Sequence, residues 1–187
     1  MIGYAICASF CTIRESLEQM RRLQNEGYEI LPILSEHAYS CDTRFQTALE
    51  VRERIESITG KVPLHTIVEV EPLGPKLPLD ALIVAPITGN TLAKVAAGIT
   101  DGAVTMAIKA HLRSDRPTLL ALASNDALSQ NLPNVGRLLS RKSTYFVPMR
   151  QDDPERKPHS LVADFEKLPE ALTRALRGEQ MRPLFLS

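Results

Sequence analysis

The feature that most constrains the fold is the apolar run from Leu79 to Ala85, followed at once by the segment Pro86 to Thr91. The run is far shorter than the roughly 20 residues of a membrane span, and it has the length of a buried strand. We expect Pro86 to end this strand and a helix to begin near Thr88. A strand, a polar turn and a helix in this order predict a ligand site in an α/β fold.

The rest of the chain continues this alternation. Apolar runs predict further strands at 2–8, 28–34, 65–70, 117–123 and 144–147, the last strand of the chain. Helical patterns cover 12–26, 43–59, 88–99, 101–113, 133–142 and 164–178, and a polar loop fills 151–159. Thr12 and Glu15 have the spacing of a capping box, whereas Pro32 is awkward for a central strand. This order predicts one domain over 1–187, with a mostly parallel, about six-stranded sheet in a three-layer Rossmann-like fold.

Composition excludes several classes of protein. Lys plus Arg and Asp plus Glu each number 22, so no basic excess indicates nucleic acid. The apolar runs are too short for a membrane span, and the first residues lack the pattern of a signal peptide. Three cysteines, with no Cys-x-x-Cys pair, indicate neither a disulfide framework nor a metal site. We therefore expect a cytoplasmic protein that binds a small molecule.

Polar residues follow the predicted strands at the edge where ligands bind in open α/β sheets. They include Ser9 and Thr12 after the first strand, Ser35 and His37 after the second, and Asn125 after the fifth. Hydroxyl groups and helix N-termini can hold a phosphate without a cation, although each Ser or Thr can equally serve as a helix cap. Neither a Gly-x-Gly-x-x-Gly motif nor a P-loop motif is present.

The segment from Asp80 to Asp101 resembles the signature of the homo-oligomeric flavin-containing Cys-decarboxylase family. That signature reads Ala-Pro-Ala-Ser/Thr-Ala-Asn-Thr, followed by a Lys and by Gly-Ile-x-Asp. The remainder is similar to one branch of that superfamily, the flavoprotein (B) subunits of dipicolinate synthases. The stretches that carry this second resemblance are Cys11-Thr12, Asn25 to Gly27, Thr43 to Phe45, Glu71 to Asp80, Asn125 to Leu128 and Gln151 to Pro154.

The resemblance implies an FMN-type fold and a role for individual residues. Ser9 and Ser35 match positions that hold the FMN phosphate, and Thr105 matches a contact of the flavin ring. Asn90 matches the residue whose amide would bind a substrate carboxylate, and its alternative role is a cap in the first helical turn. The full set of expected cofactor-binding residues is Ser9, Thr12, Ser35, Pro86, Thr88, Asn90, Thr91, Thr105 and Asn125. The stretch around Asn125 departs from the family pattern, since it reads Ala-Ser-Asn-Asp where the decarboxylases have Pro-Ala-Met-Asn.

The catalytic histidine of the decarboxylases has no counterpart at the expected spacing. The nearest candidate in sequence is His65, 15 positions before Asp80, whereas His37 follows the second strand on the site side. We expect His37 rather than His65 to be the catalytic histidine. The loop 151–160 is either a lid, a partner surface or a solvated connector.

The branch implies a flavoprotein subunit that helps to oxidise a dihydrodipicolinate-type precursor to dipicolinate during sporulation. Its partner would be the A subunit of dipicolinate synthase, which carries NADP, and the chain itself would form a homo-oligomer. The expected location is the cytoplasm of the mother cell of a spore-forming bacterium. Two alternatives stay open: an FMN-dependent decarboxylase of a cysteine-derived carboxylate, and a non-catalytic scaffold subunit.

Overall fold

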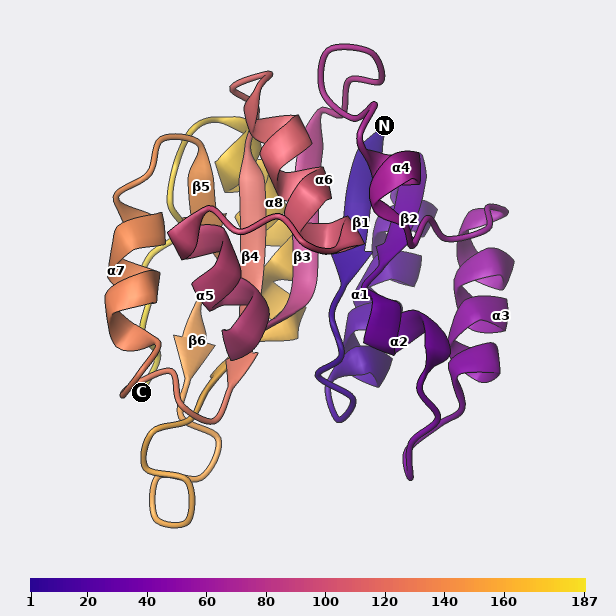
Figure 1. The fold of residues 1–187 in the computed structure, drawn as a ribbon. Helices are drawn as coiled ribbons and strands as arrows, with labels where there is room; N and C mark the ends of the chain where they lie inside the picture. The colour runs from indigo at the N-terminus through magenta and orange to yellow at the C-terminus, as the bar shows by residue number, and fades with distance from the viewer.

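A seven-stranded sheet runs through the centre of the computed structural model, which describes residues 1–187 (Figure 1). Five neighbouring strands are parallel, in the order β2 (Ile30–Leu34), β1 (Ile2–Ile6), β3 (Ala81–Thr88), β4 (Thr118–Ser124) and β5 (Thr144–Phe146). Two short strands, β7 (Leu161–Ala163) and β6 (Met149–Arg150), add antiparallel pairs beside β4. The mostly parallel α/β fold is thus confirmed, but the segment at 144–147 is not the last strand.

Helices cover both faces of this sheet (Figure 1). One face carries α1 (Ile13–Asn25), α3 (Ala48–Thr59), the short 3-10 turn η1 (Phe165–Lys167) and α8 (Leu168–Leu176). The opposite face carries α4 (Ile67–Val70), α5 (Gly89–Ala97), α6 (Ala103–Leu112) and α7 (Leu132–Leu139). The short helix α2 (Glu36–Ser40) follows β2. Each face buries an apolar cluster of 24 residues, which explains why the central strands are apolar throughout.

The predicted strand at 65–70 is wrong, because most of this segment forms helix α4. Thr66 caps the helix, and its hydroxyl accepts a hydrogen bond from the Glu69 N–H at 3.3 Å. The Glu69 carboxylate in turn accepts a bond from the Thr66 N–H at 2.9 Å, so both halves of a capping box are present. Val68 is 82% exposed while Val70 is buried in the core, so only one side of the apolar run faces the protein interior.

The helix predicted from residue 43 begins only at Ala48, since the true capping box is formed by Thr47 and Glu50. Phe45, which the helical pattern placed on the apolar face, is exposed in the loop before the helix. The capping box predicted at Thr12 is also wrong. Thr12 precedes α1, but its hydroxyl donates to the Ser9 carbonyl and to the Ser9 hydroxyl, both at 3.0 Å.

Pro86 does not end β3, which continues to Thr88. The register against β4 shifts between Val84 and Ile87, so the proline sits at an irregularity where the ladder tolerates a missing N–H. Pro32 is tolerated for a related reason, because β2 is the outermost strand at its end of the sheet. None of the helices has both the length and the apolar character required to cross a membrane.

Candidate functional site

The sheet order reverses at β1, because the chain moves to β2 on one side and then to β3 on the other. Ligands in open α/β sheets bind beyond the carboxyl ends of the strands at this point. In Figure 1 the strands β1, β2 and β3 end toward the lower part of the molecule, where they are followed by a loop, by α2 and by α5. A cavity of about 290 Å³ lies there. It is lined by Ala8, Ser35, Glu36, His37, Thr88, Asn90, Thr91, Lys94, Asp101, Gly102, Ala103, Val104 and Thr105.

Six of the predicted site residues meet in this cavity although they come from three separate parts of the chain. They are Ser35, His37, Thr88, Asn90, Thr91 and Thr105. The lining also includes Glu36, Lys94 and Asp101, which we did not predict as site residues. Lys94 follows Asn90 by one helical turn, so helical spacing was the signal that would have placed its side chain on the same face.

Three hydroxyl groups of the cavity also cap helices. The Ser35 hydroxyl accepts from the Ala38 N–H at 3.3 Å, and the Thr88 hydroxyl accepts from the Thr91 N–H at 3.2 Å. The Thr105 hydroxyl accepts from the Gly102 N–H at 3.1 Å. The alternative role as caps is therefore correct for these side chains. The Thr88 and Thr105 hydroxyls also donate, to the Thr91 hydroxyl at 3.1 Å and to the Gly102 carbonyl at 3.0 Å, so of the three only Ser35 keeps its hydrogen for a ligand.

Asn90 is exposed and lies in the first turn of α5. The cap of this helix is Thr88, so the alternative in which Asn90 serves as the cap is wrong. Its side-chain amide forms no hydrogen bond within the chain, while its neighbour Thr91 receives one from the Thr88 hydroxyl at 3.1 Å. Asn90 is therefore free to bind a ligand with both its N–H and its carbonyl groups.

The cavity is lined by one cation, Lys94, and by two carboxylates, those of Glu36 and Asp101. Lys94 donates to the Asp101 carboxylate at 2.8 Å. This hydrogen bond lowers the pKa of Asp101, so the pair stays ionised at neutral pH. Lys94 thus provides a positive charge in the cavity, but this charge is paired with the Asp101 carboxylate.

A half-buried polar cluster lies directly beneath Gly89, the first residue of α5. The Asn131 amide donates to both carboxylate oxygens of Asp126, at 2.9 and 3.0 Å. The Ser124 hydroxyl donates to the same carboxylate, and this bond lowers the pKa of Asp126. A Cβ atom at position 89 would lie 2.7 Å from Asn131 Nδ2, 2.7 Å from Asp126 Oδ1 and closer still to Ser124 Oγ. The family signature has Ala at this position, and the cluster explains why only Gly fits here.

Four predicted residues do not line this cavity. Ser9 and Thr12 bond to one another in the loop after β1, and Pro86 is buried within β3. Asn125 is exposed in the loop after β4. Their roles in binding stay predictions.

Three histidines lie in different surroundings. His37 lines the cavity, whereas His65 stacks on the Tyr39 ring with 3.7 Å between ring centroids, outside the lining residues. His111 is buried at the end of α6, with its Nε2 3.0 Å from the Pro117 carbonyl oxygen. Among them, only His37 is placed to act on a ligand in this cavity.

The comparisons with known proteins agree with this geometry. The family model described as Flavoprotein matches residues 1–166. The B subunit of dipicolinate synthase from Bacillus subtilis (strain 168) is 42% identical over 185 residues, which cover 99% of this chain and 92% of that protein. The crystal structure of the dipicolinate synthase B subunit from Bacillus halodurans C gives a TM-score of 0.91 at 40% identity, covering 100% of this chain and 95% of that one.

A more distant solved structure shares the fold. The FMN-dependent cysteine decarboxylase SpaF gives a TM-score of 0.69 at 24% identity and covers 94% of both chains. Because the family model spans most of the chain and the two dipicolinate synthase proteins match its whole length, this chain belongs to the flavoprotein family, within the group of dipicolinate synthase B subunits.

Proposed function

We propose that this chain is the FMN-binding subunit of a dipicolinate synthase and that residues 1–187 act as one flavoprotein-type domain. In this role it contributes to the oxidation of a dihydrodipicolinate-type precursor to dipicolinate during sporulation. The observation that carries the proposal is the cavity at the reversal point of the sheet, where six predicted site residues meet in a chain 42% identical to a dipicolinate synthase B subunit.

The donor set of the cavity fits a flavin phosphate. The hydroxyl groups of Thr88 and Thr105 line it but already donate to the Thr91 hydroxyl and to the Gly102 carbonyl. The hydroxyl groups of Ser35 and Thr91 keep a hydrogen that no bond within the chain uses, and the N-terminus of α5 opens onto the cavity. Such neutral donors, together with the positive end of a helix dipole, stabilise a phosphate without a dedicated arginine. Lys94 adds a positive charge that Asp101 partly offsets. When bound, FMN would supply the capacity to accept a hydride from the substrate.

Asn90 would orient the substrate in this cavity. Its free amide N–H donates to a substrate carboxylate, and its carbonyl accepts from a ring N–H. His37 is exposed at the same cavity, and an imidazole nitrogen there would take up the proton that leaves when the dihydropyridine ring becomes aromatic. The two residues would thus divide positioning and proton transfer between them.

The proposed assembly has two levels. The Bacillus subtilis relative is named as the B subunit of its enzyme, which supports a second kind of subunit. We propose that this second protein is an A subunit that carries NADP. The cavity of about 290 Å³ lies at the lower limit of the volumes usual for small-molecule sites, which supports its completion by another copy of this chain. The proposed location is the cytoplasm of the mother cell.

Decarboxylation of a cysteine-derived carboxylate has less support. His65, the histidine closest in sequence to the family signature, is packed against Tyr39 and does not line the cavity. We therefore propose oxidation, with decarboxylation and a non-catalytic scaffold as outcomes of the test below.

The test combines a flavin titration with an activity assay. The purified chain is titrated with FMN and then mixed with the dihydropyridine substrate and its A subunit, and dipicolinate is measured. We expect FMN to bind and the mixture to form dipicolinate faster than the isolated A subunit does. The N90A variant should keep FMN but lose most of this gain, whereas N25A, at the exposed end of α1 and outside the cavity, should not.

Three results would contradict the proposal in different ways. No FMN binding would remove the flavin role, and no gain over the isolated A subunit would favour a scaffold. Release of CO₂ from a cysteinyl substrate by this chain alone would favour the decarboxylase.

A further inference from the structure

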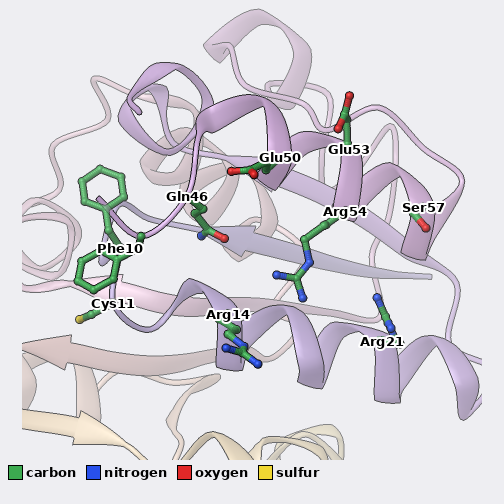
Figure 2. A pocket seen from close by; sticks show the side chains of 10 residues that line it. Phe10, Cys11, Arg14, Arg21, Gln46, Glu50, Glu53, Arg54 and Ser57 are labelled. Carbon is green, nitrogen blue, oxygen red and sulfur yellow. The ribbon is translucent and has the colours of Figure 1, made fainter. Parts of the chain in front are cut away.

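A second and larger cavity, of about 620 Å³, opens between α1 and α3 on the other side of the loop that follows β1 (Figure 2). We call it the α1–α3 groove. It is lined by Phe10, Cys11, Arg14, Arg21, Phe45, Gln46, Glu50, Glu53, Arg54 and Ser57. None of these residues lines the proposed flavin cavity, so the groove is a separate site. Its volume lies within the usual range for small-molecule pockets.

Two arginines in the groove have no acidic partner. Arg21 on α1 and Arg54 on α3 form no ion pair within the chain, and Figure 2 shows both guanidinium groups pointing into the space between the helices. Arg14 has only an exposed contact with Glu18 at 3.5 Å. Like charges on facing helices repel, so an anion placed between them would lower the free energy of the folded protein.

The two carboxylates of the groove do not fill this role. The Glu50 carboxylate accepts from the Thr47 N–H at 2.7 Å and from the Thr47 hydroxyl at 3.0 Å, which holds it in the cap of α3. The positive charge of Arg54 also lowers the pKa of Glu50, but it is the smallest of the causes. Glu53 points away from the guanidinium groups in Figure 2. The donors of the groove therefore outnumber the acceptors available to them.

Gln46 supplies a third observation. Its side-chain amide points into the groove in Figure 2, and its Nε2 atom is buried without a hydrogen-bond acceptor. A buried donor without an acceptor destabilises a protein, and such groups are rare unless a water or a ligand satisfies them. An oxygen atom of a ligand beside Arg54 would meet this need.

The opposite end of the groove is aromatic. Phe10 is half-buried there, and Phe45 is 54% exposed, with the Arg44 guanidinium 4.8 Å from its ring centroid. An exposed aromatic ring at the rim of a pocket offers a flat surface on which a planar ring can stack. One ligand thus has to satisfy guanidinium groups at one end and phenyl rings at the other.

We propose that the α1–α3 groove binds a mononucleotide, with its phosphate on Arg21 and Arg54 and its base against Phe10 and Phe45. Guanidinium groups match a phosphate better than ammonium groups do, because their paired N–H donors bind two oxygens at once. A phosphate monoester carries close to two negative charges at neutral pH, which matches the two unpaired arginines. This site is distinct from the proposed flavin cavity and does not depend on it.

The test is isothermal titration calorimetry of the full chain, saturated with FMN, against adenosine 5′-monophosphate. We expect binding of this probe, and binding at least about tenfold weaker for adenosine, which lacks the phosphate. The R21Q and R54Q variants should each weaken binding of the monophosphate about tenfold. R137Q is the matched control, because Arg137 is exposed on α7 and also lacks an acidic partner.

Three outcomes would overturn the inference. The first is that the monophosphate does not bind. The second is that R21Q and R54Q bind it as tightly as R137Q does. The third is that the two variants lose FMN itself in a separate titration, which would place the flavin rather than a second ligand in the groove.

Discussion

Replacement of Gly89 by Ala tests how tightly the first turn of α5 is held against the polar cluster below it. The new methyl group would lie 2.7 Å from both Asn131 Nδ2 and Asp126 Oδ1, and nearer to Ser124 Oγ. Contacts this short force the neighbours to move, and overpacking of this kind costs about 1–3 kcal/mol. Movement would also weaken the hydrogen bonds of a charged carboxylate, which contribute about 1.5–3 kcal/mol each.

A partial gain opposes this cost. Ala is favoured over Gly within a helix by about 0.5–1 kcal/mol. We therefore expect G89A to lose about 2 kcal/mol of unfolding free energy, which in a chain of this size lowers the Tm by about 4–8 °C. The measurement is thermal unfolding followed by calorimetry.

Gly136 provides the matched control for this substitution. It lies inside α7, and a Cβ atom at this position would meet no atom within 4 Å. G136A should therefore raise stability by about 0.5–1 kcal/mol. Removal of the closest clash should rescue the first variant in part, so G89A/S124A should melt above G89A. A G89A protein that melts at or above the wild-type temperature would refute the reasoning.

Three further predictions concern titratable groups. The lowered pKa of Asp126 means that its stabilising effect is present above the unfolded pKa of about 3.9 and is lost as the pH falls through the folded value. Urea midpoints of D126N should therefore change less than those of the wild type below pH 4. Burial lowers the pKa of His111, so the wild type should lose stability as the pH falls below about 6.5. The H111N variant should lose less stability over the same pH range, and equal pH profiles of the two proteins would contradict this. Burial raises the pKa of Cys7 to about 11, so iodoacetamide at pH 8 should label Cys11 and Cys41 but spare Cys7, as mass spectrometry can check; rapid labelling of Cys7 in the folded protein would contradict its burial.

The sequence predicted those parts of the fold whose signals are local. The apolar run before Pro86 forms most of β3, and Thr88 and Gly98 cap the two ends of α5. The prediction of a strand at 65–70 was wrong, although the signal for the helix that forms there is also local. Thr66 and Glu69 have the spacing of a capping box, but the apolar residues between them outweighed that signal in the prediction.

Other features depend on contacts that sequence patterns do not contain. The strands β6 and β7 have only two and three residues, so they are defined by pairing rather than by any periodicity: β7 pairs with the end of β4, and β6 pairs with β7. The need for Gly89 is set by Asp126 and Asn131, which lie 37 and 42 positions further along the chain. The α1–α3 groove likewise joins two helices whose relation only the packed structure reveals.

The caps at the proposed flavin cavity connect the energetics of folding with the energetics of binding. The Thr91 N–H donates to the Thr88 hydroxyl, which in turn donates to the Thr91 hydroxyl. The hydrogen of the Thr91 hydroxyl is the one member of this chain still available to a phosphate, and each bond in such a chain polarises the next. Affinity for the cofactor and strength of the helix start are thus properties of the same few atoms. Across a set of variants at these positions, flavin content and melting temperature should rise and fall together.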